Sequence, residues 1–505
     1  MKEYPELFDS KKNLKLSGQA DIYAYLFFQT ARFLKDRGRM GIVTSNSWLD
    51  VAYGYELQKF FLMNFKIVAI LESRCEPWFE DAAVNTVVTI LERKERYSNT
   101  KEDIDNHLVK FVKIKKRLKD IIPWDMKIEA MRRWSGLDKL VHKIEKTGSE
   151  HLRLEGTKYQ NTLKGVASYE DDDLRIRVAK QGKLLDDLES TGKAVKWGKF
   201  LRAPDVYFEI LKKCKGKFVP LKELAKVRFG IKPGITKFFF LTKDTIEHWK
   251  IENEFLSSMI RTPKEAAELT INLKDLGFKM LSCREDINKL KKYKGLSTYI
   301  KWGEKQKTKN GTSWPNVPSV KGKKYWYDLG EREVADGLWP EMYFDSHRII
   351  LNNLRVFESD KFYGITVFKR KDSKLIIAIL NSVIIHLQRG LSGFHSLGEG
   401  VLKMAVYEVE DMLMPEITKI EANVKSAIVK AFDSLLERPI KPIFEEVKMK
   451  DRQKLDSLVL KAIGIDQKKY LKPLYKGLCE LVRERIDLAQ MRKKVKKAKT
   501  QKDVE

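Results

Sequence analysis

The stretch Gly38-Arg-Met-Gly-Ile-Val-Thr-Ser-Asn-Ser-Trp48 sets a short apolar run between a glycine and a cluster of small polar residues. Such a run predicts a buried β-strand at 39–44. The elements expected on either side alternate between helix and strand, at residues 20–34 (helix), 55–64 (helix), 67–71 (strand) and 84–91 (strand). Alternation of this kind predicts a largely parallel α/β sheet, of which about three strands are visible.

The chain has 505 residues, more than one hydrophobic core usually holds, so we expect about two or three structural units. Lys and Arg number 98 against 70 Asp and Glu, which gives a net charge of +28. An excess this large favours a polyanionic partner, with nucleic acid as the leading candidate. The alternative is a lysine-rich surface of the kind found in heat-adapted proteins, although those usually match Lys with Glu.

The cysteines are far apart in the sequence and form no Cys-x-x-Cys pair, which argues against a disulfide framework and a cysteine zinc site: Cys75, Cys214, Cys283 and Cys479. The N-terminus has no apolar signal-peptide stretch, and no run approaches the roughly 18 apolar residues of a membrane span. We therefore expect a soluble, cytoplasmic protein without a membrane partner or a metal site.

Composition and periodicity change along the chain and divide it into five expected parts. These are an α/β part (1–95), a charged connector (96–200), a mixed β-rich domain (201–415), a helical C-terminal region (416–490) and a basic tail (491–505), which we expect to be frayed or disordered.

Several common catalytic motifs are missing. The sequence has no Gly-x-Gly-x-x-Gly, no Gly-Lys-Ser/Thr loop, no His-Glu-x-x-His and no Gly-x-Ser-x-Gly, so nucleotide hydrolysis and serine or zinc hydrolysis have no support. Glu446-Val-Lys448 matches the tail of a nuclease motif, but a preceding strand carboxylate is missing. A solvated helix face explains it better.

Three blocks in the N-terminal part follow one another in a recognisable order: 20–26 (Ala-Asp-Ile-Tyr-Ala-Tyr-Leu), 38–49 and 79–88 (Phe-Glu-Asp-Ala-Ala-Val-Asn-Thr-Val-Val). Together they resemble the latter half of the catalytic domain of adenine-N6 DNA methyltransferases from restriction-modification systems. The resemblance implies a partial Rossmann-like methyltransferase sheet in 1–95 and S-adenosyl-L-methionine as cofactor.

The resemblance continues through four later blocks, at 196–204, 228–238, 397–403 and 451–456. They look like the target-recognition and C-terminal parts of large methyltransferases that join methylation and DNA reading in one polypeptide. By this resemblance, 201–415 is a DNA target-recognition domain and double-stranded DNA is the substrate.

Asp21, Tyr23 and Ser45 are the candidate cofactor-binding residues. Asp21 and Tyr23 belong to the block that lines the S-adenosyl-L-methionine pocket in the family, although Asp21 could equally be an ordinary helix cap. Ser45 follows the strand at 39–44, and open α/β sheets bind ligands at the carboxyl ends of their strands. Trp48, just beyond, is more often a core anchor.

Phe79 is the candidate catalytic residue. An adenine inside a duplex cannot present N6 to a methyl donor, so the enzyme must extrude the base and hold it in a pocket. In the family, the block that begins at Phe79 supplies an aromatic face for that base. The alternative is a core phenylalanine before a strand, but the polar loop around Phe79 favours stacking.

The family also uses a Gly-containing cofactor loop and an Asp/Asn-Pro-Pro-aromatic loop, both upstream of these blocks, and no Pro-Pro dipeptide occurs in the 505 residues. We expect a protein partner that carries this N-terminal methyltransferase half to complete the active site. Two other interpretations stay open: a DNA sequence-specificity subunit without catalysis, and an inactive remnant of a split gene.

The candidate DNA-binding residues lie on two basic stretches and one loop. Residues 301–327 hold seven Lys and a single acid, interleaved with aromatic residues, and 228–237 form a glycine-bent basic turn. The alternative is a flexible basic loop around a few core aromatics. The candidates are Arg228, Lys232, Thr236, Lys237, Lys307, Lys309, Trp314, Lys323, Lys324 and Arg355.

Overall fold

The computed structural model describes residues 16, 18, 20–79, 84–95, 101–122, 130–147, 160–163, 166–397 and 400–502. They fall into two compact units. The first unit comprises the chain up to Lys215, together with Arg389–Lys403 and the stretch from Lys472 onward, and the second comprises Gly216–Gln388 and Met404–Leu471. The change of unit after Lys215 lies close to the expected start of the β-rich domain, whereas the return of two later segments to the first unit was not foreseen.

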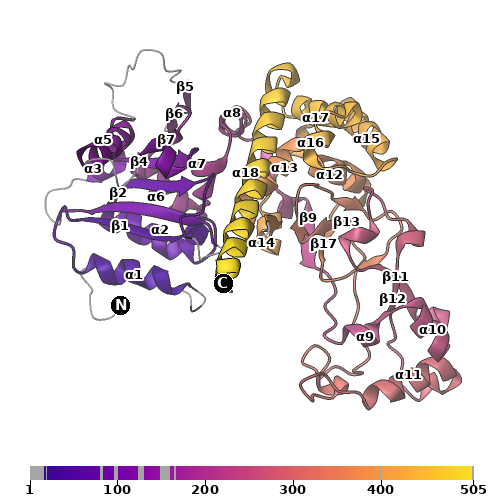
Figure 1. The fold of residues 1–505 in the computed structure, drawn as a ribbon. Helices are drawn as coiled ribbons and strands as arrows, with labels where there is room; N and C mark the ends of the chain where they lie inside the picture. The colour runs from indigo at the N-terminus through magenta and orange to yellow at the C-terminus, as the bar shows by residue number, and fades with distance from the viewer. Residues whose placement is uncertain are drawn as a thin grey trace. The chain divides into compact units, whose positions relative to one another are not determined.

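A seven-stranded mixed sheet forms the centre of the first unit (Figure 1). Its strands, in spatial order, are β1 (Arg39–Ser45), β3 (Thr86–Arg93), β2 (Phe65–Ser73), β4 (Leu108–Ile114), β7 (Leu174–Lys180), β6 (Val166–Glu170) and β5 (Gln160–Leu163). The three strands expected from the sequence are confirmed. The expectation of a largely parallel sheet is wrong: only β2 and β4 pair in parallel among the described strands, and β3, the next strand after β2 along the chain, runs antiparallel beside it.

Strands β4 to β7 lie in the segment 96–200, which we expected to be a connector. In β7, Arg175 and Arg177 alternate with apolar residues and hide the strand signal, yet both arginines are buried. The guanidinium of Arg177 pairs with Asp205 at 2.6 Å, and that of Arg175 donates to the carbonyl oxygen of Leu201 at 2.7 Å. Charged side chains with such partners can occupy a sheet interior, so this segment builds the sheet rather than linking domains.

Helices α1 (Ile22–Ala31) and α2 (Gly54–Asn64) pack against each other beside the sheet (Figure 1). Phe27 of α1 meets Phe61 of α2 with ring centroids 4.8 Å apart. Trp48 is fully buried against Phe61 and is the core anchor that its sequence context suggested. Gly54 permits this packing, since a β-carbon there would lie 2.0 Å from the carbonyl oxygen of Trp48.

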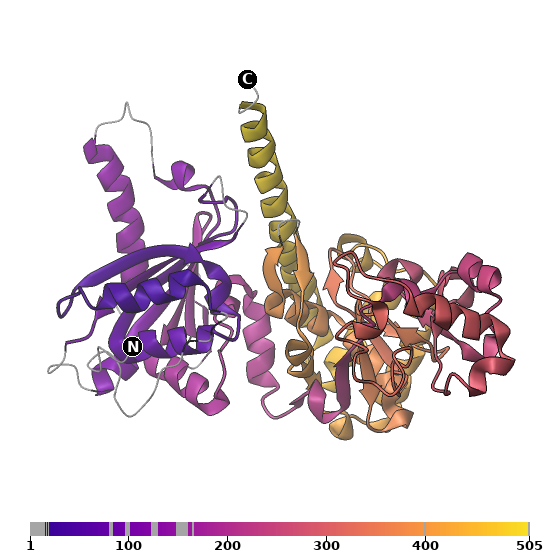
Figure 2. The ribbon, with the colours of Figure 1, turned by 90° about the horizontal axis from the view of Figure 1, so that it is seen from below.

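The remaining elements of the first unit surround this sheet. They are the 3-10 turn η2 (Asn46–Leu49), α3 (Lys101–Asn106), α4 (Leu118–Ile121), α5 (Ala130–Lys146), α6 (Gln181–Thr191), α7 (Gly198–Arg202), α8 (Asp205–Lys213), β18 (Phe394–Leu397), β19 (Val401–Lys403) and most of α18 (Gln467–Lys502). Helix α18 is continuous in both ribbon views (Figures 1 and 2). The basic tail from 491 to 502, expected to be frayed, is therefore helical.

The second unit is mixed and combines several short-stranded sheets with helices. One sheet has the order β10 (Phe240–Leu241), β12 (Phe278–Leu281), β11 (Leu256–Ile260), β16 (Phe357–Glu358). Another has the order β15 (Ile350–Leu351), β13 (Gly337–Pro340), β17 (Phe362–Val367), β9 (Ala225–Phe229), and β20 (Leu413–Pro415) pairs with β8 (Phe218–Pro220). A short strand, β14 (Met342–Tyr343), completes the set.

Helices fill the rest of the second unit. They are α9 (Thr236–Phe239), α10 (Lys243–Trp249), α11 (Lys294–Glu304), α12 (Ser373–Leu380), α13 (Val383–Ser392), α14 (Val406–Glu410), α15 (Ala422–Leu436), α16 (Ile443–Glu446) and α17 (Lys450–Ala462), with the end of α13 in the first unit. Among the described residues no single helix has the length and hydropathy to cross a membrane, and one bent pair, Arg370–Leu380 with Val383–Ser392, passes that test together.

Candidate functional site

The carboxyl ends of three strands meet at one edge of the first unit's sheet. Strands β1, β2 and β4 run in the same direction, because β3 lies antiparallel between β1 and β2, and β2 pairs in parallel with β4. This edge therefore carries Ser45 at the end of β1, Ser73 at the end of β2 and Ile114 at the end of β4. Open α/β sheets bind their ligands at such an edge.

The predicted cofactor residues come together here around a pair of tyrosines. The hydroxyl oxygens of Tyr23 and Tyr53 are 2.6 Å apart, and the hydroxyl of Tyr53 donates to a carboxylate oxygen of Asp21 at 3.3 Å. A hydrogen bond also links Tyr23 to the side chain of Ser45. Residues far apart in the sequence thus form one polar cluster, which we call the tyrosine cluster: Asp21, Tyr23, Ser45 and Tyr53.

Asp21 precedes α1 but does not serve as its side-chain cap in the described structure. Its carboxylate faces the tyrosines instead. Burial raises the pKa of Tyr23 to about 12, and burial together with the neighbouring Tyr23 raises the pKa of Tyr53 as well. Both phenols therefore stay neutral near pH 7 and offer hydroxyl groups beside a carboxylate. Tyr53 was missed from the sequence, where it looks like an ordinary residue before a helix.

A buried ionic network lies beneath the same edge. The guanidinium of Arg202, from α7, donates to both carboxylate oxygens of Glu72 at 3.2 Å and to Asp50 at 2.6 Å. Asn46, the first residue of η2, donates its side-chain amide to Glu72 at 2.5 Å. Burial alone would raise the pKa of Glu72, but the charges of Arg202 and Arg74 hold it below its usual value. Glu72 is consequently ionised at neutral pH.

Helix α18 adds a second set of charges to this edge. Glu484 accepts hydrogen bonds from Lys113 of β4 and from Arg74, the latter at 3.5 Å. Arg492 donates to the side-chain oxygen of Asn85, which precedes β3. Burial lowers the pKa of Lys113 to about 8, although Glu484 opposes the shift. Lys113 and Glu484 are 371 positions apart and meet at the strand ends, which no local sequence signal could have revealed.

Phe79 follows β2 on this edge and is 46% exposed. Phe79 is therefore not the buried core phenylalanine of the alternative interpretation. Residues 80–83, which continue the loop, lie outside the described part of the chain. An exposed aromatic ring in a loop at the strand ends is available to contact a ligand.

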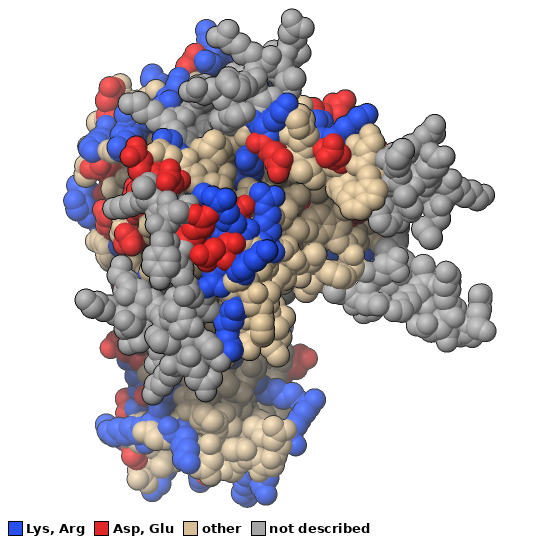
Figure 3. All heavy atoms as spheres, turned by 90° about the vertical axis from the view of Figure 1, so that its left-hand side faces the viewer, with Lys and Arg blue, Asp and Glu red and all other residues tan. Residues whose placement is uncertain are grey.

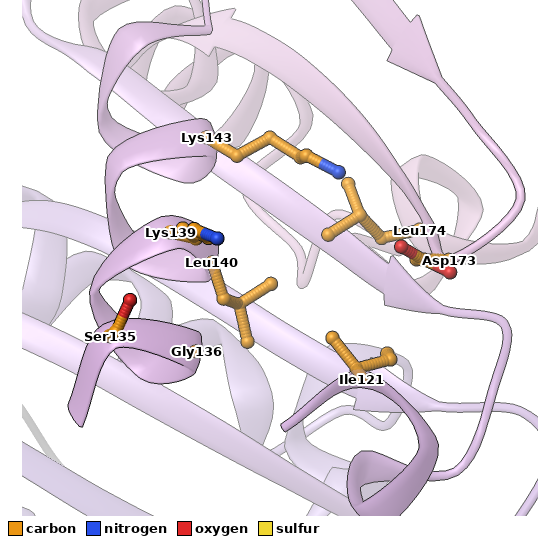
Figure 4. Close-up of a pocket in the computed structure, with 8 residues that line it drawn as sticks. All are labelled: Ile121, Ser135, Gly136, Lys139, Leu140, Lys143, Asp173 and Leu174. Carbon is orange, nitrogen blue, oxygen red and sulfur yellow. The ribbon is translucent and has the colours of Figure 1, made fainter. Parts of the chain in front are cut away.

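A cavity of about 630 Å³ lies elsewhere in the first unit, between α5 and the start of β7 (Figure 4). Figure 4 shows Leu140, Leu174 and Ile121 around it, with Lys143 of α5 near the β7 side. The ammonium of Lys143 already pairs with Asp171 at 2.5 Å. None of the predicted site residues lines this cavity, so it adds nothing to the candidate site.

In the second unit, the two predicted basic stretches lie against each other. Gly234 has a φ of +76°, and a β-carbon there would approach the hydroxyl oxygen of Ser319 to 2.2 Å. Ser319 also donates to the carbonyl oxygen of Pro233 at 2.7 Å. The basic turn therefore packs on the segment 301–327, and the exposed candidates on the two stretches are Lys232, Thr236, Lys237, Lys307, Lys309, Lys323 and Lys324.

The prediction that Trp314 contacts nucleic acid is wrong for this structure. Trp314 is 7% exposed and packs edge-on against Phe238 and Trp302. Other aromatics of the same segment, including Tyr327, belong to the same core cluster. Apolar residues interleaved with lysines here build a small core and leave the lysines outside, which agrees with the alternative interpretation of this segment.

Arg228 and Arg355 are partly engaged by carboxylates. Arg228 lies 3.9 Å from Glu358 and from Glu333, and Arg355 lies 3.2 Å from Asp336. Arg355 has a φ of +54°, which places it in the left-handed region on the loop after β15. Both guanidinium groups therefore have acidic neighbours, and Arg228 is half-buried whereas Arg355 is exposed.

The charge on the molecule is mixed rather than uniform. On the face drawn in Figure 3, acidic side chains lie among the basic ones. Despite the net charge of +28, the basic side chains therefore do not form one continuous patch on this face. Among the described residues, no group of three or more His, Cys, Asp or Glu side chains is arranged to hold a metal ion.

Comparisons with known proteins give two family matches. The model described as the C-terminal domain of the type II methyltransferase M.Eco57I matches residues 194–455, a little more than half of the chain. The model of the Eco57I restriction-modification methylase matches residues 1–79.

Two solved structures are similar to nearly the whole chain. One is the type IIG restriction endonuclease BpuSI, with 15% identity, 97% of this chain and 52% of that chain covered, and a TM-score of 0.48. The other is the type IIL restriction-modification enzyme MmeI in complex with DNA, with 13% identity, 95% and 55% covered, and a TM-score of 0.48. The chain spans about half the length of these two proteins.

Proposed function

Because the chain belongs to the Eco57I family of type II restriction-modification methyltransferases, we propose that it takes part in the S-adenosyl-L-methionine-dependent methylation of adenine N6 in DNA. The observation that carries this proposal is the tyrosine cluster at the carboxyl edge of the sheet. Residues selected from the sequence as cofactor ligands meet there, at the edge where β2, the strand before Phe79, also ends.

The tyrosine cluster fits the cofactor chemically. S-adenosyl-L-methionine carries a cationic sulfonium, an ammonium group and ribose hydroxyls, and it supplies the methyl group for transfer. The carboxylate of Asp21 can accept from ammonium or hydroxyl groups, while the neutral phenols of Tyr23 and Tyr53 can both donate and accept. The cluster therefore orients the donor and needs no proton transfer of its own.

In this proposal Phe79 holds the extruded adenine by stacking on its ring. Catalysis is then positional and electrostatic: the chain aligns the exocyclic amine with the methyl donor and excludes water, and no covalent enzyme intermediate forms. The exposed lysines of the second unit contact the phosphates of the duplex, which positions the DNA without reading its sequence.

We propose further that the missing cofactor and Asp/Asn-Pro-Pro-aromatic loops come from polypeptide sequence outside these 505 residues, carried by a separate chain. The support is the outer face of α1. Its inner face is buried through Phe27 and Phe28, yet Ile22 and Leu26 on the outer side, and Phe33 just beyond the end of the helix, are 81%, 53% and 79% exposed. A helix that is apolar on all sides normally has a covered outer face as well.

Strand β1 beside this helix is at the edge of the sheet among the described strands. The backbone amide of Asn46 donates to the carbonyl oxygen of Asn85, so the alternate residues Gly41 and Val43 turn their backbone groups away from β3. A partner strand could pair there. We call α1 and β1 together the open edge, and it borders the tyrosine cluster, so that a partner bound there would share the site.

The test is reconstitution. The chain is co-expressed with the polypeptide encoded immediately upstream, and the purified complex is incubated with duplex DNA and labelled S-adenosyl-L-methionine. We expect label in DNA, recovered as N6-methyladenine after digestion to nucleosides. DNA binding without transfer would favour a specificity subunit, and neither binding nor transfer would favour an inactive remnant.

Calorimetry on the chain alone tests the shared site separately. Because the cofactor loop is missing from these residues, we expect weak binding of S-adenosyl-L-methionine by the chain and tight binding by the complex. Tight stoichiometric binding by the chain alone would contradict the need for a partner.

A further inference from the structure

Arg202, the last residue of α7, is fully buried. Its guanidinium contacts Asp50, beyond the end of β1, and Glu72, near the end of β2. We propose that Arg202 is a positioning residue, which holds the turn η2 and thereby sets Ser45 and Asn46 at the carboxyl edge. The inference rests on the proposed function, since it assigns the fixed element of the same candidate site.

The guanidinium of Arg202 is linked by hydrogen bonds to both ends of η2, to one of them through Glu72. Asp50, which ends η2, accepts a hydrogen bond at 2.6 Å. Glu72, near the end of β2, accepts two hydrogen bonds in the bidentate geometry that suits a carboxylate, and it passes the restraint to Asn46 at the start of η2. One planar group therefore contacts the residue after the turn directly and the first residue of the turn through Glu72 of the sheet.

Ser45 is tied to this turn directly. Its hydroxyl oxygen accepts from the backbone amide of Ser47 at 3.3 Å and lies 2.8 Å from the hydroxyl of Ser47. Since Ser45 also bonds to Tyr23, a shift of η2 would move one member of the tyrosine cluster relative to the others. Arg202 itself touches none of the proposed cofactor ligands, so its effect must travel through Asp50 and Glu72.

The space beside the ion pair of Arg202 and Asp50 is narrow at Gly198. A β-carbon on Gly198 would lie 2.6 Å from a guanidinium nitrogen of Arg202 and 2.6 Å from both carboxylate oxygens of Asp50. Glycine at the first residue of α7 therefore leaves the room that the undisturbed pair requires. This requirement links the block 196–204 to the strand ends in a way that its sequence does not reveal.

Helix α7 has anchors other than the ion pair. The backbone amide of Trp197 donates to the carbonyl oxygen of Leu49 at 2.9 Å, and the side-chain amide of Gln58 both donates to and accepts from the backbone of Val195, at 2.8 and 3.0 Å. Trp197 also packs on Trp48. Because these contacts remain without Arg202, the loss of its charge should loosen η2 without releasing α7.

Stability alone gives little reason for this arrangement. Replacing a buried ion pair by well-packed apolar side chains is often neutral or stabilising, because the charges are desolvated on folding. The charged groups of Arg202, Asp50 and Glu72 instead hold one another in a single fixed geometry. That is the property a positioning residue needs.

The first experiment measures hydrogen exchange in the full chain, without partner or cofactor. We expect Arg202→Met to speed exchange of the amides of residues 45–50 by at least about tenfold. Arg452→Met is the matched control, because Arg452 is also a fully buried arginine that pairs with a carboxylate, that of Glu446, and it lies in the second unit. The control should leave exchange at 45–50 unchanged.

The second experiment uses the reconstituted complex. Arg202→Met should raise the KM for S-adenosyl-L-methionine by at least about tenfold, since a misplacement of about 1 Å can cost far more, and Arg452→Met should not. If Arg202→Met does not fold, Gly198→Ala disturbs the same pair by steric conflict and should give the same two results.

Unchanged exchange at 45–50 in both Arg202→Met and Gly198→Ala would overturn the inference, and so would equal effects from Arg452→Met. A complex without methyl transfer would count against the proposed function instead. The exchange measurement then still decides whether Arg202 positions the turn.

Discussion

Residue by residue, the candidate site depends on groups whose chemistry is changed by burial. Tyr23 and Tyr53 share a short hydroxyl contact and remain neutral, while Glu72 stays ionised beside Arg202. The polar character of the edge is therefore stable over the pH range in which a cell works. From the sequence, Asp21 and Tyr23 were candidates by resemblance and Ser45 by its place after a strand, whereas Tyr53, Glu72 and Arg202 were not candidates, because their contacts come from partners distant in the chain.

The tyrosine pair predicts a specific pH dependence of stability. In the unfolded chain a tyrosine ionises near its ordinary pKa of 10.0, whereas folded Tyr23 keeps its proton until about pH 12. Unfolding therefore releases protons between these values, and stability is lost as pH rises through that window. We expect the Tm of the wild-type chain to fall more steeply from pH 9.5 to 11, roughly, than that of Tyr23→Phe/Tyr53→Phe.

Differential scanning calorimetry across that range checks this prediction. Parallel slopes for the two proteins would show that the phenols titrate normally. Tyr169→Phe is a useful comparison, since burial also raises the pKa of Tyr169 to about 12 at a position away from the tyrosine cluster.

Phe79 allows a sharper test of catalysis. Phe79→Ala should lower methyl transfer by the reconstituted complex by about a hundredfold, because stacking on an extruded base contributes about 1–3 kcal/mol and also sets its orientation. Phe79→Trp should keep most of the activity. Filter binding at several salt concentrations should find DNA affinity nearly unchanged in both, and a parallel loss of affinity and transfer would argue against the stacking role.

Among the elements, α1 is unusual because apolar residues occupy its outer face as well as its inner one. Strand β7 shows the opposite case, in which charged residues are buried. Its arginines made a buried strand look like part of a charged connector, because periodicity cannot anticipate that Asp205 and a backbone carbonyl will satisfy them. Element types in the first 93 residues were predictable, since their hydrophobic periodicity is strong, but strand direction was not.

The open edge predicts where the partner binds. Leu26→Lys/Phe33→Asp should weaken assembly with the upstream polypeptide at least about tenfold, because each exposed apolar side chain contributes about 1.5–3 kcal/mol when it is buried. The Tm of the chain alone should stay unchanged, as both residues are exposed in it. Isothermal titration calorimetry measures the affinity.

The matched control is Trp134→Asp/Val141→Lys on α5, which removes two other exposed apolar side chains of the first unit, 68% and 40% exposed. Assembly should tolerate it. Equal affinities for the two double variants would mean that α1 does not form the interface.

For the molecule as a whole, the excess of positive charge is the property most directly related to DNA. The exposed lysines on the basic turn and on 301–327 are held by a common aromatic core, in which Phe238 contacts both Trp314 and Trp326. The core fixes the backbone and the lysines remain outside. This division of roles predicts different outcomes for lysine and tryptophan substitutions in the same segment.

Replacing the four lysines of that segment by alanine should weaken DNA binding and reduce the slope of log K against log salt, by about 0.9 for each phosphate that is no longer neutralised. The variant carries Lys307→Ala, Lys309→Ala, Lys323→Ala and Lys324→Ala. Four exposed lysines from another part of the second unit serve as the charge-matched control: Lys454, Lys461, Lys468 and Lys469. Equal slopes of log K against log salt for the two variants would show that these four lysines do not contact DNA.

Trp314→Ala should instead lower the free energy of unfolding by about 3–5 kcal/mol, the cost of truncating a large buried aromatic. Urea denaturation followed by circular dichroism measures it. A stable variant with weakened DNA binding would restore the nucleic-acid role that burial of Trp314 argues against.

Periodicity, composition and short ordered motifs are properties of neighbouring residues. They were therefore enough to predict the elements of the N-terminal part, the overall charge and the family to which the blocks belong. The folded chain was needed to see that β1, β2 and β4 end at one edge, that α18 returns to that edge and that Arg202 reaches it from α7. Such contacts join residues up to 410 positions apart, and their geometry depends on how buried charges find partners, which no local pattern encodes.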